Sequence, residues 1–215
     1  MATLVFVKDP ITLKSVQTEE KITVIFDICS SSSIVEDLMF QGKLSVFATL
    51  LNMMKKYLRE QSELIGFDVY KFIGDGWILL FPYTIDGTTL LGFLNGLSKY
   101  FQKLYNTLIK NQLEEKPLIV GLTFGVANGK LIKLVMLGKK EYIGRSINIA
   151  SRLQSSIKDR DKNPQYKVLM SRTVAKKLNI NNDPPNIRPV PRKLRNIFGG
   201  KEMQFVKVVL PLIRK

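Results

Sequence analysis

Apolar and polar positions alternate along the chain in blocks that predict strands and helices in turn. The β-branched, largely apolar run at residues 21–28 predicts a buried strand. It ends at Cys29 and the serine tract 30–33, which is typical of a polar loop that caps a helix. Apolar residues near helical spacing then predict a long helix over residues 34–63, with a break near Gly42.

A β-hairpin is predicted next. Two apolar runs, residues 67–73 and 77–81, flank the turn sequence Gly74-Asp75-Gly76, which places an acidic residue at the tip of the hairpin. Residues 88–113 return to helical spacing and predict a second helix. The first half of the chain is therefore expected to run strand, helix, hairpin, helix.

The second half of the chain is predicted to hold shorter elements. These are two strands at 118–126 and 131–136 joined by a turn at Asn128-Gly129, a helix at 146–157, a strand at 166–170, a short helix at 171–178 capped by Ser171, an irregular proline-rich stretch at 183–191 and a closing strand at 203–210. The order β-α-β-β-α-β, with further elements appended, predicts an α+β fold with a ferredoxin-like, palm-type antiparallel sheet covered by helices. We expect an N-terminal extension over residues 1–20 and a single domain over residues 21–215.

The composition excludes several kinds of site. The chain has no histidine, so histidine triads, histidine proton shuttles and imidazole zinc sites are impossible. A single cysteine, Cys29, excludes an internal disulfide and a cysteine metal cluster, and it fits a reducing cytoplasm. No apolar run is long enough to span a bilayer and the first residues do not resemble a signal peptide, so we expect a soluble cytoplasmic protein with no membrane partner.

Basic residues outnumber acidic ones and gather toward the C-terminal end. The chain of 215 residues has 33 Lys and Arg against 18 Asp and Glu, a formal charge of +15. Residues 156–215 alone hold 15 basic and 4 acidic residues, a net of +11. Such a surface indicates a polyanionic ligand, whether nucleic acid, an anionic membrane or a phosphorylated small molecule, or it serves solubility alone. A basic nucleic-acid-binding module, with Phe198 near Arg195 and Lys201, is one alternative function.

Two aspartates stand where neighbouring strands are predicted to meet. Asp27 ends the first strand and Asp75 lies on the hairpin turn, and this order of elements brings the two positions side by side at the edge of the sheet. Alone, each has a structural explanation, Asp27 as a helix cap and Asp75 as a turn residue. Together, two carboxylates beside a helix N-terminus suit two divalent cations about 3.5–4 Å apart, for an in-line displacement at phosphorus. Hard oxygen ligands favour Mg²⁺ or Mn²⁺.

Three motifs follow one another along the chain: Phe26-Asp27-Ile28, Lys71-Phe-Ile-Gly74-Asp75, and Glu141-Tyr-Ile-Gly144-Arg-Ser-Ile-Asn148-Ile-Ala150-Ser151-Arg152-Leu153. Together they resemble the motifs of the class III nucleotide cyclases, the catalytic domains of adenylyl and guanylyl cyclases. The resemblance implies that Asp27 and Asp75 bind two Mn²⁺ or Mg²⁺ ions per site, with the Ile28 carbonyl as a further ligand. It also implies that Asn148 orients the ribose and that Arg152, one helical turn further on the same face, stabilises charge on the transferring phosphoryl group.

The resemblance further implies a reaction and an assembly. The ribose 3′-oxygen of a nucleoside triphosphate would attack the α-phosphorus and release pyrophosphate, with a metal ion lowering the pKa of the hydroxyl so that no histidine is needed. Domains of this class form head-to-tail homodimers, in which one protomer supplies the metal aspartates and the other the asparagine and arginine. A chain that has both sets is therefore expected to build two equivalent shared sites.

The chain departs from the cyclase pattern around the phosphates. Where that family has a glycine and an aromatic residue after the first aspartate, this chain has a cysteine and four serines, whose N–H groups and hydroxyls suit phosphates at a helix N-terminus. The expected phosphate-binding residues of this loop are Cys29, Ser30, Ser31 and Ser32. The family lysine that binds the terminal phosphates has no clear counterpart, and Lys201 is the candidate with Arg195 in reserve.

Selection of the base is expected to depend on Lys71 and Glu141. Lys71 occupies the position where adenylyl cyclases carry lysine, and with Glu141 as acceptor the pair fits adenine, uracil or cytosine. The bulk of Phe72, Tyr142 and Arg145 favours the smaller pyrimidine where these side chains face the pocket. An adenylyl cyclase that makes cyclic AMP therefore remains the alternative enzyme.

The combination of Lys71-Phe-Ile-Gly-Asp-Gly-Trp77 with Tyr142-Ile-Gly-Arg145 in a short chain is similar to the stand-alone pyrimidine cyclases of bacterial Pycsar anti-phage systems. This resemblance implies synthesis of cyclic UMP or cyclic CMP from UTP or CTP on infection. The product would activate a separate effector protein. Nucleic acid is then not an expected partner.

Overall fold

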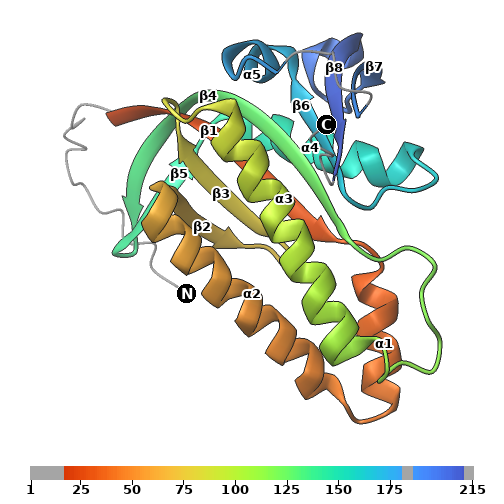
Figure 1. The fold of residues 1–215 in the computed structure, drawn as a ribbon. Coiled ribbons are helices and arrows are strands. Elements are labelled where there is room, and N and C mark those ends of the chain that lie inside the picture. The colour runs from red at the N-terminus through yellow and green to blue at the C-terminus, as the bar shows by residue number, and fades with distance from the viewer. Residues whose placement is uncertain (1–16, 181–185, 211–215) are drawn as a thin grey trace, which may run out of the picture.

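The computed structural model describes residues 17–180 and 186–210, which form a mixed β-sheet with helices packed against it (Figure 1). Its strands are β1 Gln17–Ile28, β2 Asp68–Phe72, β3 Trp77–Pro82, β4 Leu122–Met136, β5 Lys139–Ile143, β6 Lys167–Ser171, β7 Ile187–Lys193 and β8 Glu202–Val209. Its helices are α1 Ser31–Phe40, α2 Leu44–Ile65, α3 Gly87–Leu104, α4 Arg145–Arg160 and α5 Arg172–Lys177, with a π-helical turn at Tyr105–Ile109 and a 3₁₀ turn at Phe198–Gly200. The strand order is β2-β3-β1-β4-β6-β8-β7, with β5 paired to β4.

Strand β1 is an inner strand of the sheet and is buried on both faces from residue 22 onward. It pairs with β3 on one side and with β4 along its whole length on the other, from Gln17 opposite Lys133 to Ile28 opposite Leu122. A strand covered on both faces is expected to be a continuous apolar run, as residues 22–26 are apart from Thr23. Its last residues carry Asp27 to the end of the sheet.

Helices α2 and α3 cover one face of the sheet and α4 covers the other. Ile22, Val24 and Phe26 point into the larger core with α2 and α3, whereas Ile25 packs with Ala150 of α4 on the opposite face. Gly125 allows this second contact, because a Cβ there would lie 1.9 Å from the Ala150 carbonyl oxygen. The close approach fixes α4 across β4 and β1.

The predicted break in the first long helix is confirmed at Gly42. Helix α1 ends at Phe40, Gly42 adopts a left-handed φ of 68°, and the Lys43 N–H bonds back to the Leu38 carbonyl at 2.8 Å. This is the usual way for a glycine to end a helix. The second predicted helix is also present, but it is regular only to Leu104 and continues as the π-helical turn.

The predicted turn at Asn128-Gly129 is wrong. Strand β4 runs unbroken from Leu122 to Met136, since Asn128 and Gly129 pair with Ile22 and Lys21 of the long central strand. The chain reverses later, at Leu137 and Gly138, whose φ angles of 50° and 72° suit a two-residue hairpin turn. That turn leads into β5, a strand that the sequence reading missed. Residues 118–121, predicted as the start of a strand, precede β4.

The prediction of an irregular stretch at 183–191 is wrong from residue 187 onward, and residues 183–185 lie outside the described part. Residues 187–193 form β7, which contains Pro189 and Pro191. Among the described residues, strand β7 pairs with β8 alone and ends the strand order, so it is an edge strand there. Prolines two residues apart point their missing N–H groups to the same side, and at an edge that side needs no partner.

The predicted α+β, ferredoxin-like fold is confirmed. Strands β1, β2, β3 and β4, with their helices, follow the order β-α-β-β-α-β, and they lie in the sheet as β2-β3-β1-β4. Strand β1 begins at Gln17, inside the stretch expected to be an N-terminal extension. Among the described residues, no helix combines the length and the apolar character that a membrane span requires.

Candidate functional site

The fold brings Asp27 and Asp75 together at one end of the sheet. Phe26 pairs with Trp77, so the tip of the β2–β3 hairpin lies against the end of β1. Gly76 makes this approach possible, because a Cβ on it would lie 2.0 Å from the Phe26 carbonyl oxygen and 3.0 Å from the Asp27 Cα. The two carboxylates predicted from sequence to converge do so.

The two carboxylates influence each other. Burial and, to a smaller extent, a hydrogen bond with Asp75 raise the pKa of Asp27, the hydrogen bond from Lys158 opposes them, and the net pKa is about 6. Asp75 accepts a hydrogen bond from the Ser31 hydroxyl at the first turn of α1. The site is therefore a pair of acidic groups that favours a bound cation.

Helix α4 supplies two side chains to Asp27 that sequence reasoning missed. Lys158 Nζ contacts Asp27 Oδ2 and donates to the Ile28 carbonyl at 3.3 Å. Gln154 Nε2 donates to the same carboxylate at 3.4 Å and to Thr123 Oγ1 at 2.7 Å. Their spacing of four residues, continuing from buried Ala150, was the available signal, since it sets all three on one face of the helix.

The loop after β1 is partly structural. Cys29 is buried, its N–H donates to the Gly121 carbonyl at 2.8 Å, and burial raises the pKa of its thiol to about 11. The Ser30 hydroxyl donates to the Ile119 carbonyl at 2.7 Å. Ser32 is exposed in the first turn of α1, whereas Ser31 is buried against Asp75. Of the four predicted phosphate-binding residues, only Ser32 therefore presents an exposed hydroxyl next to the aspartates.

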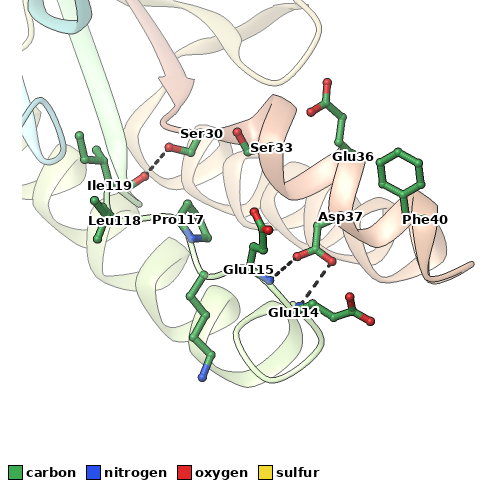
Figure 2. Close-up of a pocket in the computed structure, with 11 residues that line it drawn as sticks. Ser30, Ser33, Glu36, Asp37, Phe40, Glu114, Glu115, Pro117, Leu118 and Ile119 are labelled. Carbon is green, nitrogen blue, oxygen red and sulfur yellow. Dashed lines mark hydrogen bonds between the residues drawn. The ribbon is translucent and has the colours of Figure 1, made fainter.

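A cavity of about 710 Å³ lies beside this loop, between α1 and residues 114–119 (Figure 2). Glu36, Asp37, Glu114 and Glu115 are among its lining residues. Asp37 is not free, because it accepts the Glu115 N–H at 2.8 Å, a bond that lowers the pKa of its carboxyl. The acidic lining of this cavity does not suit a triphosphate.

Asn148 and Arg152 do not lie with the aspartates of their own chain. Both are exposed on α4. At about 100° per residue, they occupy a different side of the helix from Gln154 and Lys158, which face Asp27. Within one chain, the structure thus separates the predicted metal ligands from the predicted ribose and phosphate residues.

Lys71 and Glu141 do come together, with Tyr70 as a third member. Lys71 Nζ lies 3.2 Å from Glu141 Oε2, the Tyr70 hydroxyl donates to the same oxygen, and the Tyr142 N–H donates to the Tyr70 hydroxyl at 2.9 Å. The pairing of β2 with β3 shifts register between Val69 and Lys71, a bulge that lets two consecutive side chains reach one carboxylate. The hydrogen bonds from Tyr70 and Lys71 lower the pKa of Glu141.

The other three residues predicted to narrow the base pocket differ in their surroundings. The Tyr142 side chain is buried, its hydroxyl donates to Glu19 at 3.3 Å, and burial raises its pKa to about 12. The half-exposed Phe72 ring packs against Trp77, with ring centroids 4.8 Å apart. Arg145 is exposed as the first residue of α4.

Lys201 lies at the opposite end of the sheet from Asp27. Strand β8 pairs its last residue, Val209, with Lys167, which in turn pairs with Thr123 opposite Asp27. Lys201 precedes Val209 by eight residues, or about 26 Å of extended strand. Arg195, on the connection between β7 and β8, is at the same far end.

No protein-family model matches this sequence, and no curated protein sequence matches it. Solved structures do match. A bacterial light-regulated adenylyl cyclase matches with a TM-score of 0.69 at 18% identity, over 93% of this chain and 54% of that one. The adenylyl cyclase CyaB from P. aeruginosa matches with a TM-score of 0.62 at 20% identity, over 90% and 96% of the two chains. The guanylyl cyclase Cya2 matches with a TM-score of 0.64 at 15% identity, over 91% and 96%.

These likenesses concern the fold, because all three identities are low. The chain spans 54% of the length of the first protein and 96% of each of the other two. In this chain a single sheet with its helices holds the hairpin that carries Asp75 and the helix that carries Asn148 and Arg152. The chain therefore has the class III nucleotide cyclase fold.

Proposed function

We propose that this protein is a metal-dependent nucleotide cyclase, which joins the ribose 3′-oxygen of a nucleoside triphosphate to its α-phosphorus and releases pyrophosphate. The observation that carries the proposal is the convergence of Asp27, Asp75 and the Ile28 carbonyl at one sheet end of a cyclase fold. The proposed reaction needs neither a histidine nor a nucleophilic cysteine. This fits the chain, which has no histidine and whose one cysteine, Cys29, is buried.

The residues present fit divalent ions. The donors are hard carboxylate and carbonyl oxygens, and the ammonium of Lys158 already lies between Asp27 and the Ile28 carbonyl, where a cation is favoured. Within the described ranges no group of three or more acidic or cysteine side chains is placed to hold a metal ion, so the phosphates of the substrate would complete the coordination. Two Mn²⁺ or Mg²⁺ ions there would supply an activated 3′-oxygen and neutralise phosphate charge.

The site is proposed to be shared between two copies of the chain. Asn148 and Arg152 are exposed and face away from the aspartates of their own chain. A head-to-tail homodimer would bring them to the aspartates of the partner subunit, where a fixed guanidinium stabilises charge on the phosphoryl group. Lys201, remote from Asp27 in its own chain, can serve the terminal phosphates only in the same way.

The substrate is proposed to be a pyrimidine nucleotide, UTP or CTP. Lys71 and Glu141 present a donor and an acceptor within 3.2 Å of each other, which fits uracil O4 with N3–H, or the amino group of cytosine. The pair fits adenine as well, so the pyrimidine assignment depends on the motif resemblance. The same resemblance supports a role in anti-phage defence, in which cyclic UMP or cyclic CMP activates a separate effector protein.

The test is incubation of the purified protein with each of the four ribonucleoside triphosphates and Mn²⁺, with separation of the products. Cyclic UMP or cyclic CMP is the expected main product, and Asp75→Asn is expected to abolish it. Cyclic AMP as the main product would replace the pyrimidine assignment by the adenylyl one. No cyclic product from any of the four nucleotides would overturn the cyclase assignment.

A further inference from the structure

Lys158 binds the two oxygens that a metal ion at Asp27 would use. Its ammonium contacts Asp27 Oδ2 and donates to the Ile28 carbonyl at 3.3 Å. A divalent ion and an ammonium compete for this pair of oxygens, because two cations held by the same two atoms lie close together and repel each other. Binding of one therefore weakens binding of the other.

We propose that Lys158 is a built-in competitor of the metal ion, which the ion must displace from Asp27 and the Ile28 carbonyl in order to bind. The proposal deepens the proposed function and rests on it, since it takes these oxygens as metal ligands. It adds a residue of α4 to the site, and it makes metal affinity a property that the protein sets with one side chain.

The surroundings explain why a lysine is placed there. The Lys158 and Asp27 side chains are 34% and 20% exposed, so the contact is sheltered from water and less weakened than a surface ion pair. Asp75 lies close enough to hydrogen-bond with Asp27, and two such acidic groups repel when no cation is near. The Lys158 ammonium supplies that cation from within the chain.

A lysine suits this exchange better than an arginine. Its ammonium is a compact charge on a flexible four-carbon stem, so it can leave Asp27 without moving the helix. Gln154 continues to hold the carboxylate through its 3.4 Å hydrogen bond and is itself fixed by Thr123.

The test measures Mn²⁺ binding to the full chain without nucleotide at pH 8. The electron paramagnetic resonance signal of the free ion reports how much Mn²⁺ is bound. Lys158→Met removes the ammonium and keeps most of the length of the side chain, and it is expected to bind Mn²⁺ at least tenfold more tightly than the wild type. Lys158→Gln is the second variant, in case the methionine impairs folding. Lys162→Met, which removes an exposed charge four residues away, is the matched control and is expected to leave the affinity unchanged. Asp27→Asn is expected to abolish binding.

The outcomes separate this proposal from the function on which it rests. Equal Mn²⁺ affinity in the wild type and both Lys158 variants, with Asp27→Asn inactive in binding, would overturn the competition and leave the metal site standing. An equal gain in Mn²⁺ affinity in Lys162→Met would show that the effect comes from the net charge of the protein and not from the position of Lys158, and would overturn the proposal as well. If Asp27→Asn leaves the Mn²⁺ affinity unchanged, Asp27 is not a metal ligand, and both proposals are overturned.

Discussion

At the scale of single residues, Asp27 shows how a charged group is kept at the end of a buried strand. Burial and Asp75 both raise its pKa, and Lys158 and Gln154 supply the donors that hold its ionised form. A partly buried carboxylate with two donors is stable without a substrate. In the proposal the divalent ion takes the place of the Lys158 ammonium alone, while Gln154 keeps its hydrogen bond. The carboxylate is thus already in place for the metal ion that is proposed to bind there.

Tyr70 is expected to position Glu141, the carboxylate that is proposed to recognise the base. Its hydroxyl bonds to Glu141 and is fixed in turn by the Tyr142 N–H. Tyr70→Phe removes this hydrogen bond, so Glu141 is held by Lys71 alone. We expect KM for the preferred triphosphate to rise about tenfold, the cost of one charge-assisted hydrogen bond, with little change in kcat.

Tyr142→Phe is the matched control for that measurement. Its hydroxyl contacts Glu19 and not Glu141, so this variant is expected to keep the KM of the wild type. Steady-state kinetics with all four triphosphates also report the base preference. An unchanged KM in Tyr70→Phe, or an equal rise in Tyr142→Phe, would contradict the positioning role.

Part of the site could be predicted from single residues and part could not. The meeting of Asp27 with Asp75 follows from strand ends in a known order of elements. Lys158 could not be assigned, because its contact depends on where α4 crosses the sheet, which the Gly125 approach decides. Tyr142 was expected in the base pocket, and only the pairing of β4 with β5 shows its side chain to be buried.

At the scale of elements, the approach of the β2–β3 hairpin to the end of β1 aligns the two aspartates. Gly76→Ala is expected to push the hairpin away from β1, because the new Cβ would clash with the Phe26 carbonyl oxygen, a backbone atom that has no alternative rotamer. We expect a loss of unfolding free energy of about 2 kcal/mol or more and a loss of Mn²⁺ binding. Urea unfolding and metal titration measure the two effects.

Gly92→Ala in α3 is the control, since nothing lies within 4 Å of its added Cβ. An alanine in an exposed helix interior is expected to raise stability by about 0.5–1 kcal/mol and leave metal binding unchanged. Equal behaviour of Gly76→Ala and Gly92→Ala would contradict the close approach.

The misread elements have a common physical reason. Asn128-Gly129 carries a strong local turn signal, but pairing with twelve residues of β1 overrides it. Prolines argue against a strand, but an edge position removes the penalty in β7. Local signals predicted the helices and the hairpin well, whereas strand length and edge position are decided by neighbours distant in sequence.

At the scale of the whole molecule, part of the C-terminal basic charge is internal. Asp161, directly after α4, contacts Lys167, Arg192 and Lys207 at 3.0, 2.8 and 2.9 Å, and all four side chains are largely buried. These three cations join α4 to β6, β7 and β8 and are not available to a polyanion. The nucleic-acid alternative loses support accordingly.

Asp161→Asn is expected to leave three sheltered cations without a countercharge and to cost about 3–5 kcal/mol of unfolding free energy. Burial acts to raise the pKa of Asp161, but the hydrogen bonds from Lys207 and Lys167 outweigh it, and the net pKa lies below the ordinary 3.8. A lowered pKa gives stability that is present above pH 4 and is lost as the pH falls through the folded-state value. The difference between wild type and variant should therefore be full at pH 7 and shrink below pH 4.

Asp159→Asn, an exposed aspartate two residues earlier, is the control and is expected to change stability by less than about 0.5 kcal/mol. Denaturant unfolding at pH 7 and pH 3.5 checks both variants. A loss in Asp161→Asn no larger than in the control, or one that grows in acid, would contradict the assignment of this ion cluster.

The central claim is that two copies of the chain build each active site, with metal aspartates from one and Asn148 and Arg152 from the other. The most direct test coexpresses Asp75→Asn and Arg152→Ala chains with different tags, isolates the mixed dimer and measures cyclic nucleotide formation with Mn²⁺. Each variant alone is expected to be inactive. The mixed dimer joins both lesions in one site and leaves the other intact, so about half of the wild-type activity is expected. A mixed dimer as inactive as its parents, or a parent as active as the wild type, would contradict the account.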